Sequence, residues 1–517
     1  MNFPMSPSPA FFSPPSGPAN GSSNGLHTKS ISLAIKMHPI VNFSRVSIVP
    51  LAAAALACVC FPCVACAADT LRVGPHERFQ TIASAVKAAA PGQVIELTSG
   101  SYAEAVAINQ RVVVRGVDTG GGLPVVTPAE GKSAFHLTGG GGAVIENVAI
   151  AGSEAPVEEV SIPELVRTDA GILIESNGNE IKNVTVRRMH HGMVVFGDSN
   201  RILDNDITEN AVIGVAILSG RANSVSGNVM QKNGAHGLYL GWLNDPAMAT
   251  GDLKKYAQAM KKFRPVEETA VRKNRMVENG LTGLVLGGAA NRNTVVGNVA
   301  NSNGGRLKGS KKNWLKGAGI LLSCGPIANL VAENEVHAND NVGINVDPGT
   351  DNVFRSNSVA KNTSIGINVS ASTGNRFVEN VVTDQPDYGI ALKRWSDTQL
   401  PTSGNLLTGN DLKRNGTNAF DDSGLPFEPP AHLKFANEQS KRKMIEKYRN
   451  QAANRWDDGA RGNHHDDFDE AAEGFVDENG DGIGERPHPI PGGKAVDRPP
   501  LTTDALPQKP AADSEVP

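Results

Sequence analysis

Apolar residues follow a series of glycines at a nearly constant spacing along this chain. Nine glycines each precede apolar residues at the first and third positions that follow, and most of them stand 21 to 24 residues apart. They are Gly171, Gly192, Gly214, Gly237, Gly283, Gly319, Gly343, Gly366 and Gly389. Apolar residues two positions apart indicate short strands with one buried face. Because a unit of about 22 residues cannot close a core alone, successive units must stack, which predicts a solenoid.

Asparagines indicate which kind of solenoid this is. In six coils three asparagines stand five residues apart, in triplets that begin at Asn200, Asn223, Asn293, Asn329, Asn352 and Asn405. Asparagine tolerates left-handed backbone conformations and can bond to an asparagine one coil away. We therefore expect an all-β fold, a right-handed parallel β-helix with three strands per coil and coils about 4.8 Å apart. The leucine-rich repeat pattern is absent, and disorder is excluded because the apolar register persists.

The chain is expected to divide into a capped stack and a closing segment. Residues 69–125 form the N-terminal cap and first coils, with Ile82, Ala85 and Val86 on one face of a short helix that covers the open end. Coils fill 126–424. A surface helix is expected over 425–452. Residues 453–501 are expected to wrap around the C-terminal end of the stack, and we call them the closing segment. A disordered tail is expected over 502–517.

Two basic insertions interrupt the coils, at 242–273 and 304–317. The first contains a helical pattern of apolar residues from Leu253 to Phe263, with lysines on the other positions. Outward positions of the glycine strand are apolar in early coils and turn polar at Asn345 and Asn368. An apolar outer face should be covered. We expect the helix of the first insertion to cover it; the alternative is that a protein partner does.

Charge and cysteine usage bear on compartment and partners. The formal net charge of −4 gives no overall attraction to nucleic acid. Residues 37–68 have the features of a secretory signal peptide, which makes 1–36 a non-native or disordered extension, or else the cytosolic part of a membrane anchor. After cleavage we expect no stable membrane span and a periplasmic or secreted protein. Cys324 would then be the one remaining cysteine.

A candidate calcium loop lies near the C-terminus. Oxygen ligands stand at the first, third, fifth, seventh and ninth positions of a loop that matches the first half of a calcium-binding pattern. They are Asp477, Asn479, Asp481, Ile483 (through its carbonyl) and Glu485. Position 12 is His488, so the loop is no complete EF-hand. Asp466, Asp467 or Asp469 could supply the missing oxygens, and an acidic turn without an ion is the alternative.

The same segment carries a family resemblance. Its motifs are Asn454-Arg455-Trp456-Asp457-Asp458, Gly462-Asn463, Asp481-Gly482-Ile483-Gly484, Pro487-His488-Pro489-Ile490 and Asp497-Arg498-Pro499-Pro500-Leu501. This segment resembles the closing segment of NosD-like β-helix proteins, which are described as periplasmic and copper-binding. The family usually has tyrosine where Arg455, His488 and Pro499 stand, and aspartate at Glu485. The resemblance implies secretion, the β-helix fold and, by name alone, copper.

Copper needs clusters of histidine, methionine or cysteine. His464 and His465, beside Asp466 and Asp467, are the best transition-metal candidates, and a solvated polar loop is the alternative. His191 and His236 stand directly before a glycine, a position that we expect to face the interior. They are therefore interpreted as core residues.

Candidate ligand-binding residues lie at strand ends. Lys393, Arg394 and Trp395 could bind an anionic sugar, with Trp242 and Tyr239 as further aromatic contacts; side chains packed on the solenoid wall are the alternative.

No convincing catalytic constellation is present in the sequence. The aspartate pairs of polygalacturonase-like enzymes are absent, and Asp347-Pro348-Gly349 departs from the Asp-Pro-His motif of alginate epimerases at the histidine.

The predicted function is therefore that of a NosD-like binding protein, periplasmic or secreted. Its partner would be an anionic polysaccharide or a protein of metalloprotein maturation. A uronate lyase or epimerase is the alternative.

Overall fold

The structure is a computed structural model. It describes residues 70–506 except 159–164, 166, 243–263, 306–316, 396–398, 425–426, 433–434, 436 and 450. The expected extension 1–36, signal peptide 37–68 and most of both insertions lie outside the described residues, as does the end of the tail from 507 onward. No helix within the described ranges is long and apolar enough to cross a membrane.

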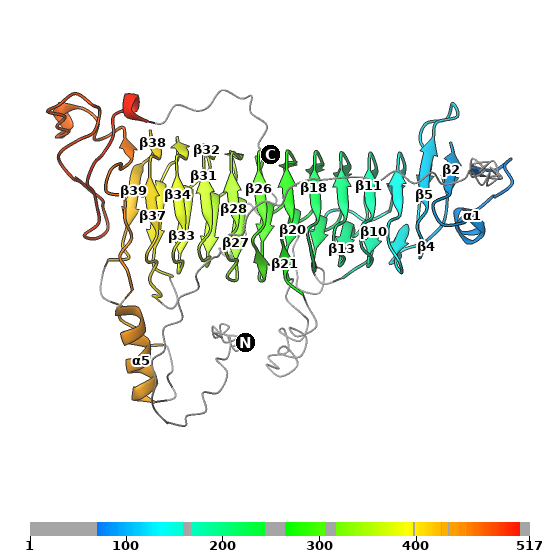
Figure 1. The fold of residues 1–517 in the computed structure, drawn as a ribbon, viewed down its shortest axis with the longest axis horizontal. Coiled ribbons are helices and arrows are strands. Elements are labelled where there is room, and N and C mark those ends of the chain that lie inside the picture. The colour runs from blue at the N-terminus through cyan, green and yellow to red at the C-terminus, as the bar shows by residue number, and fades with distance from the viewer. Residues whose placement is uncertain are drawn as a thin grey trace, which may run out of the picture. The chain divides into compact units, whose positions relative to one another are not determined.

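From β1 to β40 the described chain winds as a parallel β-helix whose coils carry strands on three sheets (Figure 1). The first sheet has 13 strands: β1 (Leu71–Val73), β2 (Val94–Thr98), β5 (Val113–Val117), β8 (Val144–Glu146), β11 (Glu180–Lys182), β14 (Arg201–Leu203), β18 (Ser224–Ser226), β22 (Ala270–Arg272), β26 (Thr294–Val296), β28 (Leu330–Ala332), β31 (Val353–Arg355), β34 (Arg376–Val378) and β37 (Leu406–Thr408).

The second sheet contains the strands that begin around the recurrent glycines, and we call it the glycine sheet. Its 12 strands are β4 (Val106–Ile108), β7 (Phe135–Leu137), β10 (Ala170–Ile174), β13 (His191–Val195), β16 (Ile213–Ile217), β20 (His236–Leu240), β24 (Thr282–Leu286), β27 (Ala318–Ser323), β30 (Val342–Asp347), β33 (Ile365–Ser370), β36 (Tyr388–Lys393) and β39 (Thr417–Asp421).

The third sheet consists of two runs that Val299 joins, because this residue bridges both Arg275 and Glu335. Its strands are β3 (Ser101–Tyr102), β6 (Val125–Val126), β9 (Ala149–Ala151), β12 (Thr185–Arg187), β15 (Asp206–Thr208), β19 (Val229–Gln231), β23 (Arg275–Val277), β29 (Glu335–His337), β32 (Ser358–Ala360), β35 (Val381–Thr383), β38 (Asp411–Lys413) and β40 (His464–His465). Short extra strands are β17 (Gly220–Arg221), β21 (Val266–Glu267) and β25 (Ala290–Asn291), and an antiparallel pair, β41 (His488–Pro489) and β42 (Val496–Asp497), lies in the closing segment.

The predicted register of the core is confirmed. Ile320 pairs with Ile344, and Ile344 pairs with Ile367, so the three side chains stack from coil to coil. All three have no exposed surface. The aliphatic residues that follow the glycines therefore fill the interior of the tube, as their period predicts.

The asparagines form continuous ladders at the bends. Asn357 donates from Nδ2 to Oδ1 of Asn380 at 2.9 Å and to the carbonyl of Val331 at 2.9 Å. Its own Oδ1 accepts from the backbone and the side chain of Asn334, at 3.1 and 2.9 Å. These amides satisfy one another and the backbone at turns that would otherwise bury unpaired polar groups. The predicted bonding between coils is confirmed.

The expectation that the residue before each recurrent glycine faces the interior is wrong. A Cβ placed on Gly343 would lie 2.5 Å from Cγ1 of Val359, so the glycine faces the interior together with the Ile344 that follows it. Two successive inward positions break the alternation, and the residue before each glycine therefore faces outward. Val342 and Ile365, which occupy that position, pack outside the tube with Ala391. His191 and His236 are buried on the same outer side, since they pair with the outer-cluster residues Ala170 and Ile213.

The outer face of the glycine sheet is apolar over its early coils, as predicted. Val194, Ala216 and Ala211 form an external cluster, and Val157 and Leu165 from the preceding loop pack onto it. The loop is tied down by a hydrogen bond from Val157 N to Ala211 O at 2.9 Å. The loop that contains Val157 and Leu165 thus covers part of this apolar face, whereas the sequence pattern predicts that the first insertion does so. The helix expected over 253–263 lies outside the described residues.

Both ends of the stack are closed. Helix α1 (Ile82–Ala88) buries Ile82, Ala85 and Val86 against the first coils, as predicted. Helix α5 (Glu438–Arg449) buries no residue, which agrees with the expected surface helix. At the C-terminal end β40 continues the third sheet beside β38. The stack also resumes earlier than expected after the first insertion, because β21 and β22 already pair with their neighbours before residue 273.

Candidate functional site

The outer face of the glycine sheet becomes polar over β30, β33 and β36. Asn345 pairs with Asn368 in register, and Ser370 pairs with Lys393 one strand further. At the end of β30, Asp347 lies beside Ser370, because Val346 is opposite Val369. We call these five residues the polar face. Asn368 donates from Nδ2 to Asn345 Oδ1 at 2.8 Å and to Ser370 Oγ at 3.2 Å. These two bonds fix the orientation of the Asn368 side-chain amide.

Asp347 is a half-buried carboxylate at the edge of the polar face. Its Oδ1 is buried and makes no hydrogen bond within the described part of the chain. Burial raises the pKa of Asp347 to about 6. A carboxyl group with this pKa is partly protonated near neutral pH, which suits acid–base chemistry or the acceptance of an anionic ligand.

Lys393 lies two strands away, about 10 Å from Asp347 by the spacing of strands. Its Nζ lies 4.3 Å from the ring centroid of Tyr388 and 5.9 Å from that of Phe420. Burial lowers the pKa of Lys393, and the charges of Asp422 and Asp387 oppose that shift. No carboxylate forms an ion pair with this ammonium group across the described ranges. The ammonium group therefore packs over two aromatic rings and remains available to an anion.

The other predicted ligand residues do not converge on one place. Arg394 is tied to Asp422, with its backbone N–H donating to Oδ1 at 2.9 Å and its Nε to the carbonyl at 3.2 Å. Trp395 is half-buried and donates from its backbone N–H to Leu400 O. Tyr239 lies in β20, five strands from β36, and Trp242 follows that strand; the hydroxyl of Tyr239 donates to Trp242 O at 3.0 Å. Trp242 is buried.

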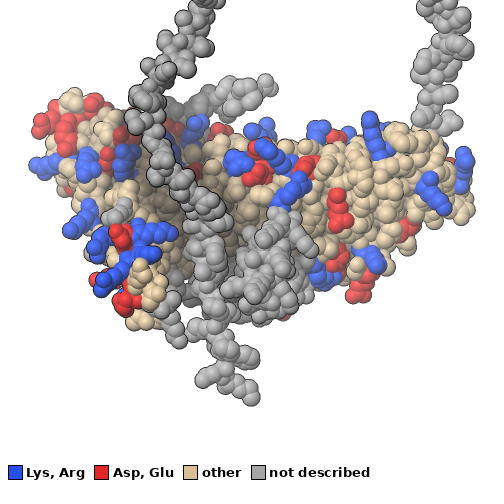
Figure 2. Space-filling model, turned by 60° about the horizontal axis from the view of Figure 1, so that its bottom comes forward, with Lys and Arg blue, Asp and Glu red and all other residues tan. Residues whose placement is uncertain are grey.

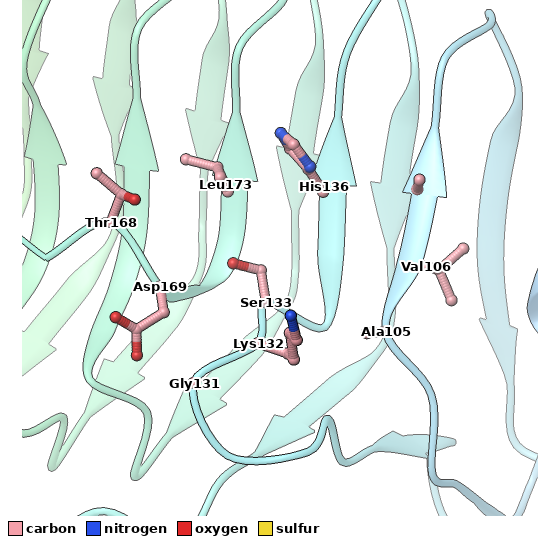
Figure 3. Close-up of a pocket in the computed structure, with 10 residues that line it drawn as sticks. Ala105, Val106, Gly131, Lys132, Ser133, His136, Thr168, Asp169 and Leu173 are labelled. Carbon is pink, nitrogen blue, oxygen red and sulfur yellow. The ribbon is translucent and has the colours of Figure 1, made fainter.

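A shallow groove occupies the opposite end of the same sheet. Its volume is about 300 Å³, and it is lined by residues of β4, β7 and β10 with the turns before them (Figure 3). Lys132, His136 and Asp169 are its ionisable groups. His136 contacts Glu175 through Nε2 at 2.7 Å, and Asp169 is held by Arg167 at 2.6 and 2.9 Å. Because Glu175 and Asp169 already have side-chain partners, these carboxylates are less open to a ligand than the charged groups of the polar face.

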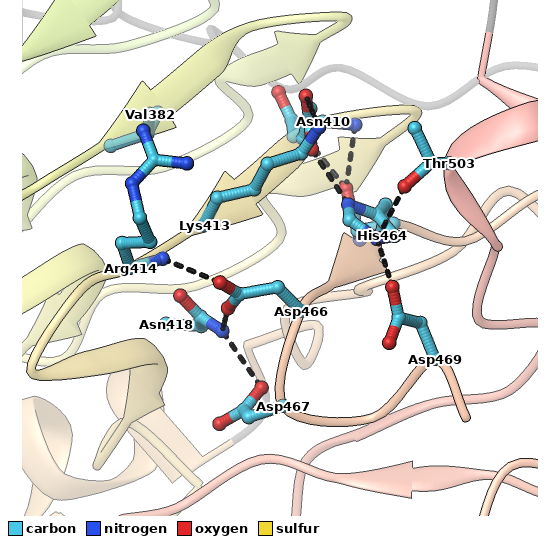
Figure 4. A network of polar contacts seen from close by, with 12 residues as sticks. Val382, Asn410, Lys413, Arg414, Asn418, His464, Asp466, Asp467, Asp469 and Thr503 are labelled. Atoms are coloured by element: carbon cyan, nitrogen blue, oxygen red, sulfur yellow. Dashed lines mark hydrogen bonds and ion pairs between the residues drawn. The ribbon is translucent and has the colours of Figure 1, made fainter. Parts of the chain in front are cut away.

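The predicted metal candidate His464 has no ring nitrogen to spare. Its Nδ1 lies 2.6 Å from Asp411 Oδ1, and its Nε2 lies 2.9 Å from Asp469 Oδ2 and 3.2 Å from Thr503 Oγ1 (Figure 4). Burial opposes the charged form, but the two carboxylates outweigh it and raise the pKa of His464. This imidazolium is part of an ion triad that fastens the closing segment to β38. Such a group is a structural element rather than a metal ligand.

His465 differs from its neighbour. Its Nε2 lies 3.1 Å from Asp497 Oδ2, and its ring is fully buried. Its Nδ1 has no hydrogen-bond partner in the described part of the chain. The ring centroid of His488 is 4.4 Å away, and Asp467 completes a group of three possible ligands. Burial, with the nearby His465, lowers the pKa of His488 to about 4, so this ring is neutral near pH 7. The sequence did contain a signal here, since His488 stands where the resembled family has tyrosine.

The candidate calcium loop is an exposed turn organised by its own carboxylates. Asp477 Oδ1 accepts from the backbone N–H of Gly480 at 2.7 Å, and Oδ2 accepts from Gly482 at 2.9 Å. Ile483 bridges to Leu501, which fixes the loop to the end of the closing segment. Asp466 and Asp469 are engaged elsewhere, with Arg414 and His464. Calcium binding by Asp477, Asn479, Asp481, Ile483 and Glu485 stays a prediction.

Comparisons with known proteins agree with this architecture. The model of the family described as "Right handed beta helix region" matches residues 170–325 and 299–429, which together span half of the chain. The chain belongs to the right-handed β-helix family. A comparison of this β-helix protein with curated proteins found no match.

Several solved structures are also similar to this β-helix protein. It is similar to the A-module of the Azotobacter vinelandii mannuronan C-5 epimerase AlgE6, at 15% identity and a TM-score of 0.49, over 66% of this chain and 90% of that one. The periplasmic alginate epimerase AlgG gives 15% identity and a TM-score of 0.41, over 62% and 72% of the two chains. The catalytic domain of an α-1,3-glucanase gives 12% and 0.43, over 68% and 66%. Similarity at this level concerns the fold alone.

Proposed function

We propose that this β-helix protein is a periplasmic or secreted binding protein of the NosD-like type, and that it binds an anionic polysaccharide on the polar face. The observation that carries the proposal is Lys393, a half-buried ammonium group without an ion-pair partner among the described residues. Its position over Tyr388 and Phe420 combines a cation for a uronate carboxylate with aromatic rings for the apolar face of a sugar. Asn345, Asn368 and Ser370 add hydrogen-bonding groups in the same rows.

A polysaccharide suits this surface better than a protein of metalloprotein maturation does. Protein interfaces need an open apolar centre. The apolar outer stretch offers none at Val194 and Ala216, because both are buried. An extended polymer, in contrast, needs a straight row of polar and aromatic groups, and the regular register of β30, β33 and β36 supplies one.

Binding is tested with purified protein on immobilised alginate and pectate. We expect Lys393→Ala to weaken retention about 10- to 100-fold, because a charge-assisted contact is lost. The matched control is Arg376→Ala, which removes an exposed positive charge from β34, in a neighbouring coil but on another sheet, and should change retention less than about twofold. Equal losses in both variants would mean that only net charge matters, and would contradict a site on the polar face.

Asp347 favours a second candidate function, that of a uronate lyase or epimerase. A uronate carboxylate bound by Lys393 acidifies the adjacent C5–H bond, and Asp347, ionised above about pH 6, can accept that proton. A lyase would then expel the 4-linked oxygen, which takes up a proton from the protonated Asp347 or from water, and leave an unsaturated uronate. In an epimerase, water would instead deliver a proton to the opposite face of C5, and Asp347 would release the abstracted proton to solvent. Ultraviolet absorbance detects the first product, and deuterium exchange at C5 detects the second. Turnover that Asp347→Asn abolishes would favour the enzyme; retention without turnover favours binding.

A further inference from the structure

The closing segment brings two histidines and an aspartate together from separate turns. His465 ends β40, Asp467 follows two residues later, and His488 begins β41. One ligand atom of each lies within 4.8 Å of the other two. Because β40 pairs with β38 and β41 pairs with β42, regular backbone hydrogen bonds fix both histidines in place.

A buried carboxylate orients His465. Asp497 has no exposed surface, and its Oδ2 accepts from Asn463 N at 2.8 Å and from Asn463 Nδ2 at 3.0 Å, besides contacting His465 Nε2 at 3.1 Å. In the neutral tautomer that carries its proton on Nε2, the ring donates to this carboxylate and leaves the lone pair on Nδ1. Metal-binding histidines in proteins are usually oriented in this way by a carboxylate on the other nitrogen.

Two imidazole nitrogens in this group lack the partner that burial requires. His465 Nδ1 and His488 Nδ1 are both buried, and neither has a hydrogen-bond partner among the residues that the structure describes. Buried polar atoms are nearly always satisfied, so a pair of them in neighbouring rings needs an explanation. A metal ion shared by both nitrogens is one that fits, because it replaces two missing hydrogen bonds with two bonds to the metal.

Asp467 supplies the oxygen and the route to solvent. It is exposed, and its Oδ1 accepts from Asn418 Nδ2 at 2.7 Å while the same amide holds Asp466 at 2.8 Å (Figure 4). Acidic side chains gather at the left end of the molecule in Figure 2, where the closing segment lies. Exposed acidic residues of the closing segment include Glu470, Glu473, Asp481 and Glu485. A field of this sign concentrates cations near the cluster.

We propose that His465 Nδ1, His488 Nδ1 and a carboxylate oxygen of Asp467 bind one late first-row divalent metal ion, such as Zn²⁺ or Cu²⁺. Imidazole nitrogen favours these ions, whereas Ca²⁺ and Mg²⁺ prefer oxygen ligands only. Donor atoms around tetrahedral zinc stand roughly 3.3 Å apart. The group therefore closes slightly on binding, which the exposed Asp467 permits. Three protein ligands leave a further coordination position for water or a partner.

The test uses the purified, untagged protein and the metal salts alone. Equilibrium dialysis against Zn²⁺, followed by elemental analysis, should give one ion per chain. His488→Ala should weaken binding by about 100-fold or more, and Asp467→Asn by about 10-fold or more. Asp497→Asn, which acts through His465, should weaken it by about 10- to 100-fold. With Cu²⁺, electron paramagnetic resonance should show two coordinated imidazole nitrogens in the parent and one in His488→Ala.

Two controls keep the proposal falsifiable. His337→Ala removes a half-buried histidine from β29, outside the group, and should leave zinc binding unchanged. Asp467 is exposed, so its asparagine variant should fold even if changes at the buried residues do not. Absence of stoichiometric binding by the parent would overturn the proposal. So would full zinc affinity in Asp467→Asn and His488→Ala, since the ion would then be held elsewhere.

Discussion

At the scale of single residues, the partner of an acidic group decides what that group can do. Asp384 is a half-buried carboxylate at the surface, and Arg414 donates to its two oxygens at 2.7 and 3.0 Å. This contact lowers the pKa of Asp384. Asp347 has no such cation within the described ranges, and burial raises its pKa to about 6. The same type of side chain is therefore an ion-paired anion at Asp384 and a carboxyl group with a raised pKa at Asp347. The lack of an ion-pair partner, rather than residue type, distinguishes Asp347 from Asp384 among the described residues.

The raised pKa of Asp347 makes stability depend on pH in a defined direction. The folded state binds this proton more tightly than the unfolded state, whose pKa is 3.8. Its contribution to stability is therefore fully present below about pH 4 and is lost as the pH rises through about 6. A shift of this size corresponds to about 2 to 3 kcal/mol. We expect Asp347→Asn to raise the free energy of unfolding at pH 7 by about that amount and to change it little at pH 4.

Urea unfolding at the two pH values measures this difference. Asp384→Asn is the matched control, because its lowered pKa gives the opposite sign: the contribution of Asp384 is present at pH 7 and is lost on acidification. If Asp347→Asn and the parent showed the same dependence on pH, the carboxylate would have to be solvated in the folded state, and its role in either function would fail.

At the scale of elements, the bends contribute as much to the fold as the strands do. Each ladder asparagine bonds to the backbone of one coil and the side chain of the next, so neighbouring coils are joined at their corners. The ladder passes from Asn380 to Asn410 and on to Asn463, where the next partner is Asp497. A carboxylate thus ends the row of amides, and the same carboxylate orients His465. The proposed metal site is built on the last member of a structural ladder.

Removing one ladder amide should lower the free energy of unfolding substantially. Asn357→Ala deletes the side chain that donates to Val331 and Asn380 and accepts twice from Asn334, so several buried polar groups lose a partner. At about 1 to 3 kcal/mol for each unsatisfied group, we expect a loss of at least 3 kcal/mol. Asn177→Ala is the control: this exposed residue accepts one bond, from Asp198 N, and its loss should cost less than about 1 kcal/mol. Similar losses in thermal or urea unfolding would show that the ladder adds little.

The fold followed from the sequence because its signals are local and repeated. Glycines, apolar pairs and asparagine triplets occur in coil after coil, so a single error of register could not persist. The orientation of His191 and His236 did not follow, since a strict alternation of two takes no account of the extra inward position that each glycine creates. The proposed metal site could be predicted only in part. The sequence indicates His465 as a metal candidate, but His488 and Asp497 come near it only through the pairing of β41 with β42. That pairing has no repeat to reveal it.

At the scale of the whole stack, stability depends on neighbours, and the ends are the weakest points. The closing segment substitutes for a further coil. Asn454 and Asn463 continue two ladders, accepting from Asn405 Nδ2 at 2.9 Å and from Asn410 Nδ2 at 2.7 Å. Trp456 covers the last interior layer with no exposed surface. Edge strands and the open core are therefore protected, in the way that α1 protects the other end.

Trp456 is expected to carry most of this protection. Its ring lies in the main core cluster, and its Nε1 donates to Asp421 Oδ2 at 3.2 Å. Trp456→Ala should cost about 3 to 5 kcal/mol, because a large buried side chain leaves a cavity. Since each coil contacts only its neighbours, that loss should be local. Hydrogen exchange should therefore speed up in β37, β39 and β40 while β13 and β16 keep the protection of the parent. Trp395→Ala, at a half-buried position, should leave both regions unchanged. Faster exchange in every coil would mean that the stack opens as one unit and that the closing segment is not an independent cap.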